Sequence, residues 1–137
     1  MEDAIAQYRT ASERGDIDAV MQALAPDVAV VSPISGRMVF RGQHDVRHLL
    51  GAVYGGLKGL RWTHRIGEGE HWVLVGEMRV AGVRMTDAMV FELGPDGLIR
   101  RISPHLRPWL GLSLFAALLG PKVARRPGVV LRALRAG

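Results

Sequence analysis

The sequence of 137 residues contains no cysteine. Disulfide bonds, thiolate metal sites, iron–sulfur clusters and cysteine nucleophiles are therefore excluded. Two glycine-rich patterns are missing as well, because neither GxxxxGK nor GxGxxG occurs in the chain. Since those patterns bind the phosphates of nucleotides, we expect neither a nucleotide nor any other cofactor.

The chain also lacks a long apolar run. The longest nearly uncharged one, residues 109–119, is about half the length that a membrane-spanning helix needs. The first residues, MEDAIAQYRT, do not have the basic start and apolar stretch of a secretory signal. We therefore expect a cytoplasmic protein.

Acidic residues are absent from the last part of the chain. Residues 97–137 hold eight Lys and Arg and no acid, whereas residues 1–96 hold ten basic and thirteen acidic residues. Basic residues there alternate with an apolar stripe at Val123, Val129, Val130, Leu131 and Leu134. This pattern predicts an amphipathic helix and not a nucleic-acid-binding surface. Residues 109–137 then either pack on the rest of the chain or contact an anionic membrane surface.

Hydrophobic residues make up 48% of the chain, which is enough for one folded domain. Apolar spacing predicts helices over residues 3–14, 17–24 and 43–54, and short strands over 28–32 and 38–40. An antiparallel meander is expected over 60–68, 71–80, 83–93 and 98–105. Two tail helices, 109–119 and 123–134, are expected on either side of Gly120–Pro121. The predicted fold is α+β, a cone-shaped curved sheet closed by N-terminal helices (residues 1–108), with a helical tail (residues 109–137).

Three short patterns follow the order and spacing seen in ketosteroid isomerases. They are A-x-Y followed by G-D-I-D-A-V near the N terminus, V-x-V-V-x-P at the end of the first strand, and D-A-M-V-F before the last hairpin. From about residue 3 to residue 106 the chain resembles these enzymes and the wider SnoaL-like, nuclear transport factor 2-like superfamily. The resemblance implies a cone around an apolar pocket, and a homodimer formed through the convex face of the sheet.

The resemblance also implies roles for particular residues. Tyr8 falls where the isomerases keep a tyrosine that donates to the substrate oxyanion, and Asp87 where they keep a protonated aspartic acid as the second donor. Ser32 stands where they keep an aspartate base, and an unassisted serine cannot shuttle that proton. His105 is the nearest titratable substitute near the last strand.

Two supporting tyrosines of some isomerases fall at Leu24 and Leu50, so the predicted pocket is more apolar than theirs. A small hydrophobic oxygenated ligand, of steroid, polyketide or terpenoid type, is expected in it. The residues predicted to bind that ligand are Met21, Ser32, Leu50, Met85, Met89 and Ile102.

No metal site is expected, because the HxxxH pair of His44 and His48 lacks both a glutamate and a third ligand. Two functions remain open. The first is an enzyme of isomerase or cyclase type that uses Tyr8 and Asp87 as oxyanion donors. The second is a non-catalytic carrier of a lipid-like ligand, or a dimeric accessory protein, whose basic tail contacts a membrane surface.

Overall fold

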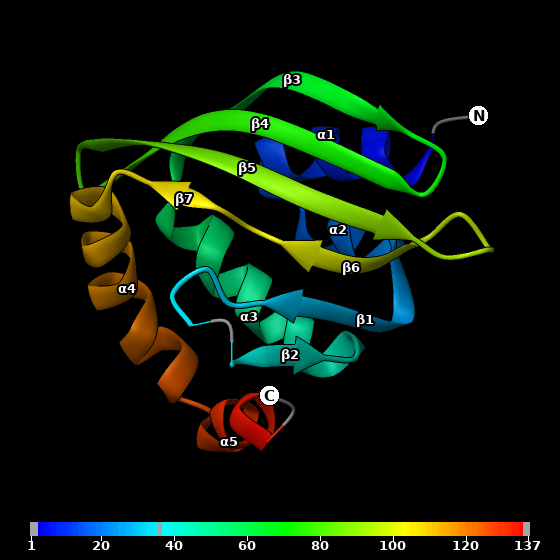
Figure 1. The fold of residues 1–137 in the computed structure, drawn as a ribbon. Coiled ribbons are helices and arrows are strands. Elements are labelled where there is room, and N and C mark those ends of the chain that lie inside the picture. Colours follow the sequence, from blue (N-terminus) through cyan, green and yellow to red (C-terminus); the bar gives the residue numbers. More distant parts are fainter. Residues whose placement is uncertain (1–2, 36, 136–137) are drawn as a thin grey trace.

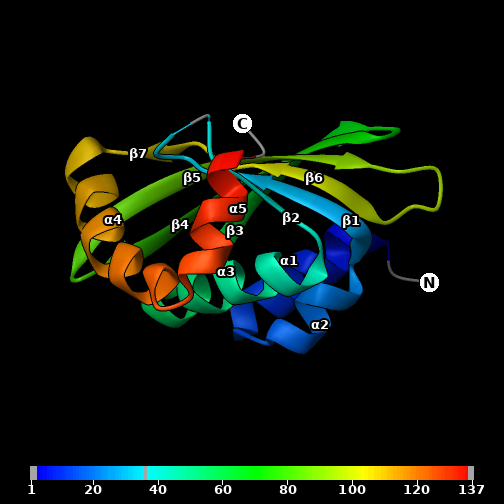
Figure 2. The ribbon, with the colours of Figure 1, turned by 90° about the horizontal axis from the view of Figure 1, so that it is seen from below.

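The computed structural model describes residues 3–35 and 37–135. One curved sheet forms the upper layer in Figure 2, and helices from both ends of the chain cover its concave side. The N-terminal helices and the C-terminal helices pack against the same hydrophobic core (Figure 1). The predicted α+β architecture is confirmed.

The first helices begin and end where the sequence supplies caps. The three helices of this half are α1 (Ala4–Arg14), α2 (Ile17–Gln22) and α3 (Gln43–Gly56). The Asp3 carboxylate accepts a hydrogen bond of 2.8 Å from the Ala6 N–H, and Asp16 accepts one of 3.1 Å from the Ala19 N–H. Such side-chain acceptors satisfy N–H groups that have no partner within the first turn of a helix. Gly15, with φ of 69°, ends α1 in the left-handed conformation.

The seven-stranded sheet has the order β2-β1-β6-β5-β4-β3, and β7 extends it beside β5. Its strands are β1 (Leu24–Val31), β2 (Val39–Arg41), β3 (Lys58–Glu68), β4 (His71–Val80), β5 (Val83–Leu93), β6 (Ile99–Ser103) and β7 (Leu106–Arg107). All pairs are antiparallel except β1 with β6. Burial alternates along β5, so Asp87 shares the concave face with Met85, Met89 and Phe91.

The second helix is shorter than its apolar stripe predicts. Leu24 was expected on that helix, with Pro26 closing it, but Leu24 begins β1 and Pro26 lies inside the strand. The pairing of β1 with β6 is irregular between Leu24 and Ala29. Proline is accommodated at this irregularity because no ladder hydrogen bond is required from its nitrogen.

The tail also differs from its predicted division. α4 (Trp109–Ala124) runs through Gly120–Pro121, and α5 (Pro127–Arg135) begins at the next proline. The expected break at Gly120–Pro121 was wrong, because the missing N–H of one proline removes a single helical hydrogen bond and the packed face of the helix compensates for it. Proline at the first helical position of α5 is favourable, since the N–H it lacks has no helical partner there.

The inner faces of the two tail helices are buried. Phe115, Leu119 and Val123 of α4 and Val129 and Ala133 of α5 belong to the hydrophobic core. α4 packs on α3 and β5, and α5 packs on β2. In the part of the chain that the structure describes, no helix has the length and apolarity needed to cross a membrane.

An ion pair between a buried carboxylate and a half-exposed guanidinium fastens α5 to α3. The Arg132 guanidinium donates from Nε to Oδ2 of Asp45 at 2.8 Å and from Nη2 to Oδ1 at 2.9 Å. Asp45 is only 6% exposed. The bidentate contact with Arg132, supported by a hydrogen bond from His44, lowers the pKa of Asp45 to about 2. On the same helix, His48 Nε2 donates to the Val123 carbonyl at 3.1 Å.

Replacing Arg132 with leucine is expected to lower the free energy of unfolding at pH 7, because the buried carboxylate loses its charged partner. The pair stabilises the fold fully above the usual pKa of Asp45, and its contribution disappears as the pH falls towards about 2. The difference between wild type and Arg132→Leu should therefore shrink from pH 7 to pH 3 in urea titrations. Arg135→Leu, on the same helix, is the control, and an equal loss in it would contradict this role of the pair.

Candidate functional site

A cavity of about 270 Å³ lies between the concave face of the sheet and helices α3, α4 and α5. Its volume is close to the lower end of the range of small-molecule pockets. Apart from Ser32, Tyr54 and Asp87, its walls are apolar. The apolar lining includes Val30, Met38, Phe40, Leu49, Val53, Leu60, Met78, Phe115, Leu119, Val123 and Val130.

Four of the six side chains predicted to bind a ligand line this cavity: Ser32, Leu50, Met89 and Ile102. Met21 and Met85 are buried but do not border it. The Met85 side chain instead lies under α4, where a Cβ added to Gly111 would come within 2.4 Å of Met85 Cγ. Helical and strand periodicity predicted that both methionines face inward. Neighbouring elements pack directly against these side chains and separate them from the cavity.

Asp87 carries the only carboxyl group on the cavity wall and is 4% exposed. Burial among apolar groups raises its pKa to about 7, and a hydrogen bond of 3.2 Å from the His105 N–H to Oδ1 partly offsets this effect. The carboxyl group is therefore extensively protonated near neutral pH. In that state it can donate a hydrogen bond to an acceptor in the cavity.

A second donor comes from a residue that the sequence analysis did not single out. Tyr54, near the end of α3, lines the cavity, and its hydroxyl lies 2.5 Å from the Tyr8 hydroxyl. Tyr8 is 0% exposed and packs edge-on against Phe91, with ring centroids 5.0 Å apart. The tyrosine expected to meet the ligand thus lies behind the wall, and Tyr54 lies in it.

The two phenols share a hydrogen bond in which either hydroxyl can donate. Burial raises the pKa of both, and the nearby Asp87 charge raises each further, so both keep their protons at neutral pH. Among the described residues, only Tyr54 forms a hydrogen bond with the Tyr8 hydroxyl. When Tyr54 donates into the cavity, Tyr8 donates to Tyr54, and this polarisation strengthens the outer bond.

The spacing of residues along α3 could have predicted Tyr54 as a residue of the cavity wall. Tyr54 follows Leu50 by four residues, so both lie on one helical face. The resemblance aligns a supporting tyrosine of some isomerases with Leu50, and in this chain a phenol occurs one turn later, at Tyr54.

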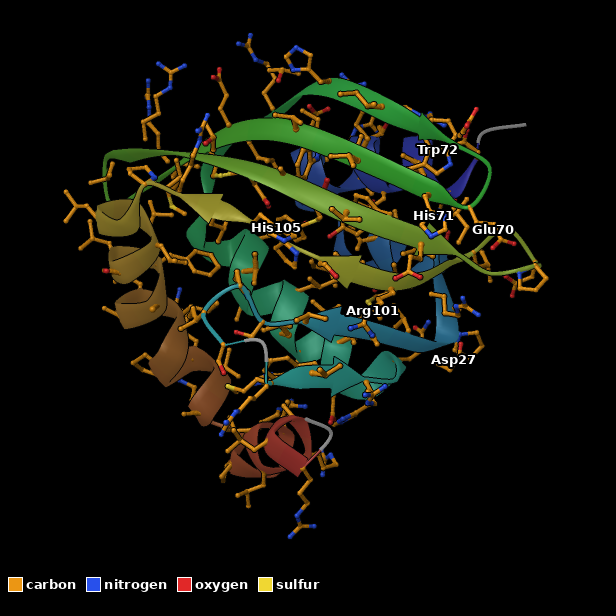
Figure 3. The ribbon with its side chains drawn as sticks, in the orientation of Figure 1. Asp27, Glu70, His71, Trp72, Arg101 and His105 are labelled. Carbon is orange, nitrogen blue, oxygen red and sulfur yellow. The ribbon has the colours of Figure 1, made fainter. Side chains whose placement is uncertain are left out.

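Ser32, at the position where isomerases keep a base, and His105, the predicted substitute, differ in how they meet the cavity. Ser32 borders the cavity, but its Oγ accepts hydrogen bonds from the N–H groups of Ile34 at 3.2 Å and Ser35 at 3.3 Å. This hydroxyl therefore caps the loop after β1. The His105 side chain is exposed between β6 and β7, where Nδ1 donates to the Ala88 carbonyl at 3.2 Å (Figure 3). Only the backbone of His105 reaches the site, through its N–H to Asp87.

The histidine pair of α3 has other partners. His44 contacts Asp45, and His48 donates to the tail, as described above. Over residues 3–35 and 37–135, no group of three or more His, Cys, Asp and Glu side chains is placed to hold a metal ion.

Replacing Asp87 with asparagine is expected to make stability less dependent on pH. The raised pKa means that the folded state holds a proton that the unfolded state loses above pH 4, so wild-type stability falls as the pH rises towards about 7 and then levels off. Relative to wild type, Asp87→Asn should gain about 2–3 kcal/mol between pH 5 and pH 8 in urea titrations. Asp27→Asn, an exposed aspartate on β1, is the control, and parallel stability curves for wild type and Asp87→Asn would refute the buried protonated state.

A model of the SnoaL-like domain family matches residues 5–102. No curated protein matches the chain. Among solved structures, a protein from Silicibacter pomeroyi described as having a cystatin-like fold is 22% identical, with a TM-score of 0.87 over 99% of this chain and 95% of that one.

Two enzymes are also similar in structure. A steroid delta-isomerase from Pseudomonas aeruginosa is 23% identical, with a TM-score of 0.77 over 95% of this chain and 93% of that one. The epoxide hydrolase/cyclase-like enzyme SalBIII, which has a role in pyran ring formation in salinomycin, is 17% identical, with a TM-score of 0.65 over 76% and 88%. These likenesses show the fold, and the family match covers most of the chain. The chain belongs to the SnoaL-like domain family.

Proposed function

We propose that the protein binds a small apolar molecule bearing one oxygen atom, and that Tyr54 and Asp87 donate hydrogen bonds to that oxygen. The observation that carries the proposal is that the Tyr54 phenol and the buried Asp87 carboxyl group, whose pKa is raised to about 7, share the wall of an otherwise apolar cavity. Donors of this kind are costly to bury unless an acceptor satisfies them. A ketone, an enone or a phenol supplies that acceptor and fills the remaining volume with carbon.

The same arrangement suits a reaction of isomerase or cyclase type. When a proton leaves the carbon beside a carbonyl group, negative charge develops on the carbonyl oxygen. Fixed donors in a dry site stabilise that charge more than water does, because they need no reorganisation. Likeness to a steroid isomerase and to a cyclase-like enzyme supports a polycyclic or polyketide-like substrate.

Fluorescence titration with a phenolic steroid analogue tests the proposal. Tyr54→Phe and Asp87→Leu should each weaken binding by about ten- to hundredfold, the range expected for loss of one hydrogen bond to a charged or strongly polarised oxygen. Tyr8→Phe should have a smaller effect, because its hydroxyl acts through Tyr54.

The matched control ligand is the same ring system without its hydroxyl group, and the control variant is Met89→Leu on the same wall. Both donor variants should bind the control ligand about as well as wild type does. Equal losses for the two ligands would show that the substitutions damage the pocket as a whole, and the proposed oxygen site would then be wrong.

A non-catalytic carrier is the second candidate function. The hydrogen bonds that the Ser32 hydroxyl accepts from its own loop favour this function. With Ser32 Oγ occupied by two backbone N–H groups, no base stands opposite the donors where the isomerases keep an aspartate. A pocket of this kind holds an oxygenated ligand without moving its protons.

Introducing the missing base separates the two candidates. Ser32→Asp should produce measurable isomerisation of a 3-keto-5-ene steroid, followed by absorbance of the conjugated enone, while wild type and Ser35→Asp remain at the uncatalysed rate. Ser35 lies in the same loop but does not border the cavity. A folded Ser32→Asp protein that binds the steroid without turnover would contradict isomerase-like alignment and leave the carrier function.

A further inference from the structure

The outer faces of the tail helices expose large apolar side chains. Leu110 and Leu118 of α4 are 49% and 47% exposed, and Leu131 and Leu134 of α5 are 55% and 52% exposed. They are four of the six exposed large hydrophobic residues among those the structure describes. Because the inner faces of the same helices form part of the core, the outward leucines do not result from loose packing.

Basic residues share these outer faces. Lys122 and Arg125 follow Leu118 by four and seven residues and continue its face of α4, and Arg135 follows Leu131 by four residues on α5. Arg126 is exposed in the turn between the helices. No acidic residue occurs from residue 109 onward. Among the described basic residues of this tail, only Arg132 forms an ion pair, with the Asp45 carboxylate.

Leucine beside uncompensated lysine and arginine matches one kind of surface. Apolar side chains enter the boundary between headgroups and acyl chains of a bilayer, and the flanking cations meet anionic lipid headgroups. A nucleic acid satisfies the cations but leaves the leucines in water. In Figure 1, α4 runs down the left edge of the molecule and α5 follows at the bottom, whereas the N terminus lies at the upper right.

We propose that the outer faces of α4 and α5 dock on an anionic lipid bilayer. The inner faces of these helices contribute Phe115, Leu119, Val123 and Val130 to the cavity wall, so the docked surface and the cavity are separated by the thickness of one helix. The docked protein therefore exchanges its apolar ligand with the bilayer, a consequence that rests on the function proposed above. Docking itself does not depend on the ligand.

Co-sedimentation of the full chain with vesicles tests the docking. Binding is expected to phosphatidylcholine vesicles that contain phosphatidylserine, to be weak on phosphatidylcholine alone, and to fall at high salt. Leu131→Ser/Leu134→Ser and Arg125→Gln/Arg126→Gln should each reduce binding by about ten- to thirtyfold, because each removes two contacts with the bilayer. The matched control is Arg14→Gln/Arg100→Gln, which removes the same charge from α1 and from β6 and should bind as wild type does.

Because the substituted side chains are exposed, the variants should unfold at the wild-type urea concentration, and they should bind the phenolic analogue normally in the absence of vesicles. That second titration distinguishes failure of docking from failure of the ligand site. Absence of vesicle binding, losses in the control equal to those in the tail variants, or binding to single-stranded DNA in preference to anionic vesicles would each overturn the proposal.

Discussion

The concave face of a strongly curved sheet has to be covered by other elements, because the side chains that project from it are too short to fill the space they enclose. In this protein α1 and α3 cover one part of that face and the tail helices cover another, which leaves about 270 Å³ unfilled. Asp87 on that face and the two tyrosines on the covering helices are thereby largely shielded from water. The raised pKa values of Asp87, Tyr8 and Tyr54 all follow from this constraint.

Local chemistry predicted most of the elements and Asp87, one of the polar residues of the cavity wall. Asp3, Asp16 and Gly15 mark the helix boundaries because capping depends on residues within one turn. Asp87 stood out because a carboxyl group in an alternating apolar strand has to be paired or protonated, and the strand's period of two settles which face it occupies. Pro26 and Pro121 led to wrong element boundaries, because tertiary packing tolerates Pro26 inside β1 and Pro121 inside α4.

The lining of the cavity was harder to predict, because it depends on how elements approach one another. Met21 and Met85 point inward as periodicity requires, but whether an inward side chain reaches the cavity is decided by what lies above it. Tyr54 was overlooked for a related reason. Its partner Tyr8 is 46 residues away in sequence, and no local pattern relates the two phenols.

The limits of the family domain and the limits of the cavity do not coincide. The SnoaL-like match ends at residue 102, whereas Pro104, Leu106 and six wall residues of α4 and α5 lie beyond it. The family domain therefore includes Tyr54 and Asp87 but only part of the cavity wall. Because the tail helices complete that wall, a change in their side chains would alter the shape of the cavity while Tyr54 and Asp87 stay in place.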